Sequence, residues 1–178
     1  MDRKHGDNKR VKITTGPFLV PSEIGSELQG GRENDRVVII LKNPTNKRLQ
    51  AKVKISVALQ PGGTSRGGTT VFRNLREREI NLGTFVVQPN SVTRIERNIT
   101  GAFGLGNSER NAVLRVTAKG DFKVSRRSSQ PVSGLLEISV VGGSVFNPSE
   151  PGLEQGDPVT FFRFKDFILV DKKHDHDD

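Results

Sequence analysis

The chain has 178 residues, a formal net charge of +8, 33% hydrophobic residues and no cysteine. Without cysteine, disulfides, thiolate metal sites and a cysteine nucleophile are excluded. The length suits one β-sandwich or barrel around a single core, and the glycines and prolines fall between apolar runs, as turn residues do.

Both ends of the chain are charged. Residues 1–12 contain five Lys or Arg and two Asp, whereas residues 171–178 contain two Lys and four Asp. We predict a basic flexible arm over 1–12, one domain over 13–170 and an acidic tail over 171–178. Because no apolar segment follows the N-terminus and no apolar run is long enough to span a bilayer, we expect cytosolic synthesis without a signal peptide and no transmembrane segment.

The first extended segment is Val11–Val20, in which Gly16 and Pro17 favour a bend. The polar, glycine-rich stretch Ser22–Asp35 is typical of a loop.

The clearest pattern follows in Arg36–Leu59. Val37–Leu41 is a continuous apolar run, which favours a strand buried on both faces, and residues 43–46 (Asn-Pro-Thr-Asn) favour a turn. From Ala51 to Leu59 apolar and polar residues alternate, which indicates a strand with one buried face. Together the two arms predict a β-hairpin.

Further strands are expected along the rest of the chain. Pro61–Thr70 has four glycines and predicts an exposed loop, and Val71–Leu82 alternates imperfectly with arginines. Residues 85–87 predict a strand, and residues 92–99 predict the strand that returns beside it. Ala112–Lys119 predicts a half-buried strand and Leu135–Val141 a central strand. A long loop is expected at Phe146–Pro158, and the last strand at Val159–Val170.

Eight or nine strands with turns about every ten residues, and no helical periodicity, predict an all-β fold. We expect an antiparallel two-sheet β-sandwich, of jelly-roll or immunoglobulin-like kind. By alternation, the predicted core side chains are Val38, Ile40, Val53, Ile55, Val57, Val86, Ile95, Leu114, Val116, Ile138, Val140, Phe162 and Phe164.

Residues suited to catalysis are scarce. The three histidines, His5, His174 and His176, all lie in the terminal segments, so a Ser-His-Asp arrangement inside the domain is excluded. The glycine pairs do not form phosphate-binding loops, since none precedes a helix and no Gly-Lys-Ser/Thr motif follows. No pattern places two carboxylates across a cleft for glycosidic chemistry. We predict that the protein is not an enzyme and carries no cofactor and no metal site.

Arginines give the one pattern that favours a ligand. If they converge on one sheet face, they would bind a polyanion or nucleic acid. The alternative is a solvated or ion-paired face, since glutamates alternate with the arginines. The candidate polyanion contacts are Arg73, Arg76, Arg78, Arg94, Arg97, Arg126 and Arg127, with Arg115 on a further strand.

Several segments resemble small signal-less β-sandwich proteins of spore-forming bacteria and, more distantly, endospore appendage subunits. These segments are TGPF, LKNPT, AKVKISV, FVVQPNSV, LRVTAKGDFKVS and LLEISVVGG. The resemblance implies a sandwich that assembles into fibres on a spore or cell surface through an N-terminal connector. The appendage subunits cross-link through cysteine, and this chain has none, so covalent linkage is not implied here.

Our first hypothesis is therefore a self-assembling structural protein. In it, Lys12–Val20 adds as a strand to a neighbouring subunit, with Ile13, Phe18, Leu19 and Val20 as contact residues. The alternative is that Lys12–Val20 is the first strand of its own sandwich. The second hypothesis is a polyanion-binding module that uses the arginines.

Overall fold

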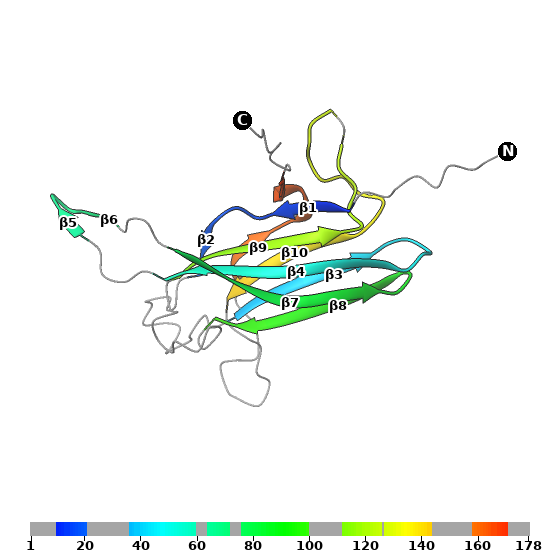
Figure 1. Cartoon of the computed structure of the whole chain (residues 1–178), viewed down its shortest axis with the longest axis horizontal. Coiled ribbons are helices and arrows are strands. Elements are labelled where there is room, and N and C mark those ends of the chain that lie inside the picture. The colour runs from blue at the N-terminus through cyan, green and yellow to red at the C-terminus, as the bar shows by residue number, and fades with distance from the viewer. Residues whose placement is uncertain are drawn as a thin grey trace, which may run out of the picture.

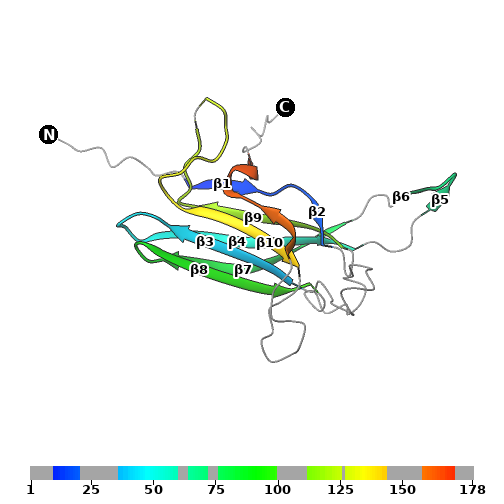
Figure 2. The same ribbon diagram turned by 180° about the vertical axis from the view of Figure 1, so that it is seen from behind.

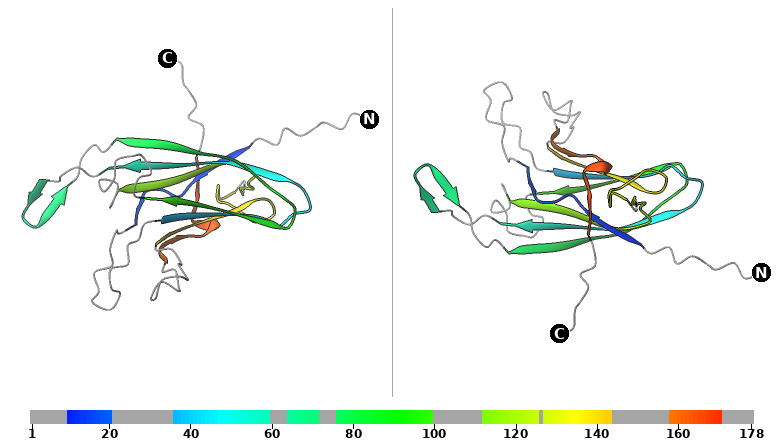
Figure 3. Two further views of the ribbon diagram at one scale, coloured as in Figure 1. Left: turned by 90° about the horizontal axis from the view of Figure 1, so that it is seen from below. Right: turned by 90° about the horizontal axis from the view of Figure 1, so that it is seen from above.

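The computed structural model describes residues 10–20, 36–59, 64–71, 76–99, 112–125, 127–143 and 158–170. These residues form an all-β sandwich of two antiparallel sheets (Figures 1 and 2). Seen edge-on, the long strands of both sheets run in similar directions, and the hairpin of β5 (Thr64–Arg66) and β6 (Thr69–Val71) stands apart from them (Figure 3).

The larger sheet, here called the large sheet, has the strand order β12-β1-β9-β4-β7, and β2 also pairs with β9. Its strands are β1 (Val11–Thr14), β2 (Phe18–Leu19), β4 (Leu49–Ala58), β7 (Glu77–Val87), β9 (Val113–Gly120) and β12 (Ile168–Leu169).

The second sheet, here called the small sheet, has the strand order β11-β10-β3-β8. Its strands are β3 (Arg36–Asn43), β8 (Ser91–Asn98), β10 (Glu137–Gly143) and β11 (Pro158–Phe162). Between β11 and β12 lies a short 3-10 helix, Phe164–Asp166.

One core fills the space between the sheets. Seven of the predicted core side chains are fully buried: Val53, Ile55, Val57, Leu114, Val116, Ile138 and Val140. Three more, Ile95, Phe162 and Phe164, are partly buried and pack against the core. Alternation within single strands therefore identified most of the inner faces.

Three of the predicted core positions were wrong. Val86 is 44% exposed and its neighbour Val87 is buried. In β3 the fully buried residues are Val37, Ile39 and Leu41, so Val38 and Ile40 point outward and are half-buried. Both errors occur where consecutive apolar residues leave the phase of the alternation undefined.

The predicted hairpin of Arg36–Leu59 was also wrong. Both strands form where expected, but β3 pairs with β10 and β8, whereas β4 pairs with β9 and β7. The connection between them therefore crosses from one sheet to the other. The apolar sides of the two strands face each other across the core instead of lying side by side in one sheet.

Asn43 holds this crossing in place. Its side chain is fully buried, and its Nδ2 donates to the carbonyl oxygens of Lys47 at 2.7 Å, Val87 at 3.0 Å and Gln88 at 3.0 Å. Its Oδ1 accepts hydrogen bonds from the backbone N–H and the hydroxyl of Thr45. One amide thus ties the β3–β4 crossing to the β7–β8 crossing.

Three predicted boundaries also change. Val11 and Lys12, assigned to the basic arm, belong to β1. Residues 64–70, expected within an exposed loop, are exposed but form the β5–β6 hairpin together with Val71, and its turn has Gly67 and Gly68 at φ 58° and 78°. The last predicted strand, Val159–Val170, is in fact two strands, β11 in the small sheet and β12 in the large sheet. Between them the chain turns at the 3-10 helix, where the Asp166 carboxylate accepts the backbone N–H of Arg163 at 2.7 Å.

The predicted loops at 22–35 and at 146–157 lie outside the described residues, as do the three histidines, the first nine residues of the arm and the whole acidic tail.

Candidate binding surfaces

The N-terminal segment pairs within its own sandwich. β1 pairs with β9 and β12, and β2 pairs with β9. Of the four candidate subunit contacts, Ile13, Phe18 and Val20 are 0%, 8% and 2% exposed, and only Leu19, at 47%, points outward. The Phe18 ring also lies 4.9 Å from the Phe162 ring, centroid to centroid.

Buried threonines fix this pairing. The hydroxyl of Thr14 donates to the carbonyl oxygen of Val116 at 3.1 Å, and the Val116 N–H donates to the hydroxyl of Thr15 at 3.1 Å. Detaching the segment would expose three core side chains and leave these polar groups without partners, which costs several kcal/mol in total, on the order of 1–3 kcal/mol for each large apolar side chain. In this arrangement the segment fills the pocket of its own subunit.

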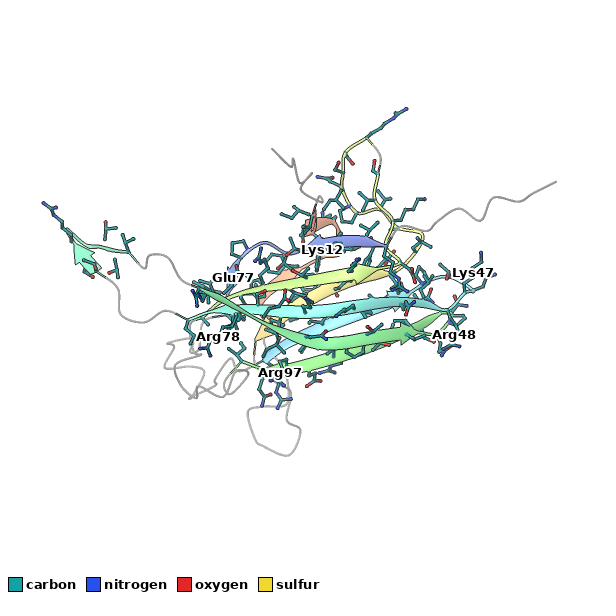
Figure 4. The ribbon with its side chains drawn as sticks, viewed as in Figure 1. Lys12, Lys47, Arg48, Glu77, Arg78 and Arg97 are labelled. Carbon is teal, nitrogen blue, oxygen red and sulfur yellow. The ribbon has the colours of Figure 1, made fainter. Side chains whose placement is uncertain are left out.

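The candidate arginines do not converge on one face. Arg78 lies on β7 of the large sheet, and Arg94 and Arg97 lie on β8 of the small sheet. Figure 4 shows Arg78 and Arg97 at one end of the sandwich and Lys47 and Arg48 at the other. Arg76 precedes β7, Arg127 lies in the connection between β9 and β10, and Arg73 and Arg126 lie outside the described residues.

Several of the basic residues bind glutamates. Arg94 and Arg36 both contact Glu96, at 2.6 and 2.9 Å. On the large sheet, Arg115 pairs with Glu77 and Lys54 pairs with Glu79. These contacts match the ion-paired alternative, in which arginines and glutamates on neighbouring strands neutralise each other.

Three lysines, in contrast, lie side by side on the large sheet, at positions that the sequence pattern did not single out. Lys12 on β1 lies directly opposite Lys119 on β9, and Lys119 lies directly opposite Lys52 on β4. All three side chains are exposed on the outer face of the large sheet, and none forms an ion pair with a carboxylate of the described residues. We call these three residues the lysine row; Figure 4 labels Lys12 on β1.

The outer face of the small sheet has a different character. Val38 of β3 lies opposite Val141 of β10, and Phe161 of β11 lies opposite Val141 on its other side. Ile40 lies opposite Ser139, diagonal to Val141. Val38, Ile40 and Val141 are half-buried, and Phe161 is 52% exposed, with the Arg163 guanidinium carbon 5.9 Å from its ring centroid. We call Val38, Ile40, Val141 and Phe161 the apolar face.

The described residues offer few groups for chemistry. An open pocket of about 310 Å³ is lined by Arg48, Leu49, Gln50, Val86 and Asp121. Its single carboxylate, on Asp121, accepts the Gln50 N–H at 2.8 Å. Within the described ranges, no three His, Asp or Glu side chains are grouped to hold a metal ion, and no helix has the length and apolarity needed to cross a membrane.

No protein-family model, curated protein or solved structure matches the chain. The resemblance to spore appendage subunits therefore stays a prediction.

Proposed function

We propose that this protein is a non-enzymatic structural protein that assembles with copies of itself through the apolar face of its small sheet. The supporting observation is the composition of β3. An antiparallel sheet that faces water on one side usually alternates between apolar inner and polar outer residues. In β3 the outward residues Val38 and Ile40 are as apolar as the buried residues between them.

The surroundings of the apolar face suit a second copy of the same chain. Its rim carries both signs of charge: Arg36 and Arg94 flank Glu96, and Lys42 lies opposite Glu137. Two copies related by a two-fold axis present the same patch to each other, so a patch with both signs can match itself. The occupant we propose is accordingly the apolar face of another copy.

Sheet edges are a less favourable route to assembly. β7 begins with Glu77, Arg78 and Glu79, and its pairing with β4 has a register shift between Val53 and Lys54. Charged side chains and bulges are the usual devices that prevent edge-to-edge pairing. The other long edge strand, β8, carries Arg94, Glu96 and Arg97. Face packing remains the better route.

The size of the face sets the expected affinity. The whole outer face of the small sheet, with four strands about 4.8 Å apart and about seven residues at about 3.3 Å each, covers roughly 440 Å² in plan, and the apolar face is only part of it. A standard interface buries about 800 Å² on each partner. We therefore expect weak, concentration-dependent dimers, with a dissociation constant in the micromolar range or above.

Sedimentation over a concentration series tests this proposal. In Ile40→Glu a carboxylate replaces one of the two outward apolar residues of β3. We expect the dissociation constant to rise at least about 100-fold, because burying a charge at an interface costs several kcal/mol. The matched control is Ile168→Glu, which changes a residue 59% exposed on the large sheet.

A wild-type chain that stays monomeric at the highest soluble concentration would contradict the proposal. So would equal weakening by both variants, since that would indicate a general effect of added charge. Growth of dimers into a fibre needs a second contact, and deposition on a spore or cell surface rests on the sequence resemblance. Negative-stain electron microscopy of the wild type beside Ile40→Glu tests the fibre.

A further inference from the structure

We infer that the lysine row is a binding site for a linear polyanion, a chain that carries closely spaced tetrahedral oxyanions such as phosphate. The inference is independent of the proposed self-assembly, because the lysine row lies on the other sheet. It also differs from an arginine face, since Lys12, Lys52 and Lys119 hold the site.

The strand register places like charges opposite each other in the lysine row. Side chains directly opposite each other on antiparallel strands are nearest neighbours, and like charges in such positions are destabilising. Here the unfavourable pairing occurs twice in succession, from Lys12 to Lys119 and from Lys119 to Lys52. The rest of this face neutralises its charge, as the Lys54–Glu79 and Arg115–Glu77 pairs show. A negatively charged ligand bound along Lys12, Lys119 and Lys52 would offset the repulsion between them and so account for these two like-charge pairs.

The nearby carboxylates are already engaged. Glu79 binds Lys54, and Glu77 binds Arg115. Asp121, two residues after Lys119, accepts the backbone N–H of Gln50. Among the described residues, none of the three lysines forms an ion pair with a carboxylate, so their charges are available to an external anion.

The shape of the site favours a linear ligand. Two interstrand spacings make the lysine row about 10 Å long, and the exposed Thr84, opposite Lys52, extends it by one strand with a hydroxyl. The row runs across the strands of an open sheet face and not into a cleft. A chain of anions laid along this line would meet one ammonium group per strand.

The chemistry of the site favours recognition of charge alone. Lysine binds phosphate as a point charge, whereas arginine provides the planar fork for bidentate contacts. Sites for single-stranded nucleic acids add aromatic side chains on which bases stack. Among the described residues, the outer face of the large sheet carries no phenylalanine, and the chain has no tyrosine or tryptophan. A phosphate polymer without bases is therefore the ligand class we propose.

Binding of the full chain to inorganic polyphosphate tests the inference, with heparin, duplex DNA and orthophosphate as parallel probes. We expect polyphosphate to bind with an affinity that falls about 20-fold between about 50 and 200 mM salt, as three contacts to a single anionic strand predict. The triple variant Lys12→Gln/Lys52→Gln/Lys119→Gln should bind at least about tenfold more weakly at low salt.

The matched control removes three positive charges elsewhere. Lys47, Arg66 and Lys123 are exposed residues outside the face, and changing all three to Gln should leave most of the affinity intact. Thermal unfolding of both triple variants checks the fold, and relief of repulsion should leave the lysine-row variant at least as stable as the wild type.

Equal losses in the two triple variants would overturn the inference, because they would indicate attraction by net charge alone. Tighter binding of duplex DNA than of polyphosphate would overturn the ligand class. Heparin binding through the same lysines would support a site for oxyanions on a chain, and its affinity relative to polyphosphate would distinguish sulfate from phosphate.

Discussion

Replacing Asn43 should remove much of the stability of this sandwich. The side chain is fully buried and takes part in five hydrogen bonds, three from Nδ2 and two to Oδ1. The amide has two N–H groups for three carbonyl oxygens, so its contribution is that of about four bonds at about 1 kcal/mol each. We expect Asn43→Ala to lower the free energy of unfolding by about 4 kcal/mol.

Urea unfolding measures this loss, and thermal unfolding checks it. A loss of about 4 kcal/mol corresponds to a melting temperature lowered by about 8–16 °C for a domain of this size. Asn43→Asp separates hydrogen bonding from packing, because the carboxylate keeps the shape but faces three carbonyl oxygens without a donor. It should therefore destabilise the protein at least as much as alanine does at neutral pH.

Asn46, exposed in the same turn, is the control, and Asn46→Ala should change the stability by less than about 0.5 kcal/mol. If Asn43→Ala costs less than about 1 kcal/mol, or if Asn43→Asp is as stable as the wild type, the amide does not hold the two crossings together.

Two further predictions concern packing and chemistry. A Cβ at Gly120 would lie 2.4 Å from the carbonyl oxygen of Gln50 and 2.6 Å from the Cα of Ala51, so Gly120→Ala should cost about 1–3 kcal/mol or more in urea unfolding. Gly142→Ala should cost less, because its one short contact is with a methyl group of Val20, and equal losses would show that the backbone contact is not decisive. We also expect no turnover in a broad screen for hydrolase and nucleotide-hydrolysing activity, and turnover that disappears on changing one carboxylate would contradict this.

The strands themselves were largely predictable, because each depends on neighbours in sequence. The alternation in Ala112–Lys119 identified both β9 and its buried side, Leu114 and Val116. Where apolar residues run on without a break, the pattern lost its phase. At Val86 and Val87 either residue could face inward, and only packing against the rest of the sheet decided the matter.

Alternation does not predict which of the two sheets a strand joins. β3 and β4 have an apolar side each and a turn between them, which fits a hairpin as well as it fits two facing strands. The buried amide of Asn43 decides for the crossing, and its role depends on the carbonyl groups of Val87 and Gln88, which are far away in sequence. Local turn propensity explains the bend after Asn43 but not its direction.

The lysine row could not be predicted from the sequence either, because it depends on which strands pair and in what register. Lys52 and Lys119 each read as an ordinary solvent-facing position of a half-buried strand, and Lys12 fell within a predicted flexible arm. Only the register of β1, β9 and β4 brings the three together. The arginines, which are more conspicuous in sequence, are distributed over strands of both sheets, and several of them are neutralised by glutamates.

The lysine row and the apolar face lie on the outer faces of different sheets, and the core separates them. If the apolar faces of two copies pack together, each copy still exposes its lysine row, and the two rows point away from each other. Ile40→Glu should then abolish dimers but leave the affinity of one lysine row for short polyphosphate unchanged. The lysine-row variant should dimerise at least as well as the wild type, because removing like charges lowers the repulsion between copies. Long polyphosphate should cross-link wild-type dimers, since one dimer can hold two chains, whereas the Ile40→Glu monomer has one row and no second site to join them.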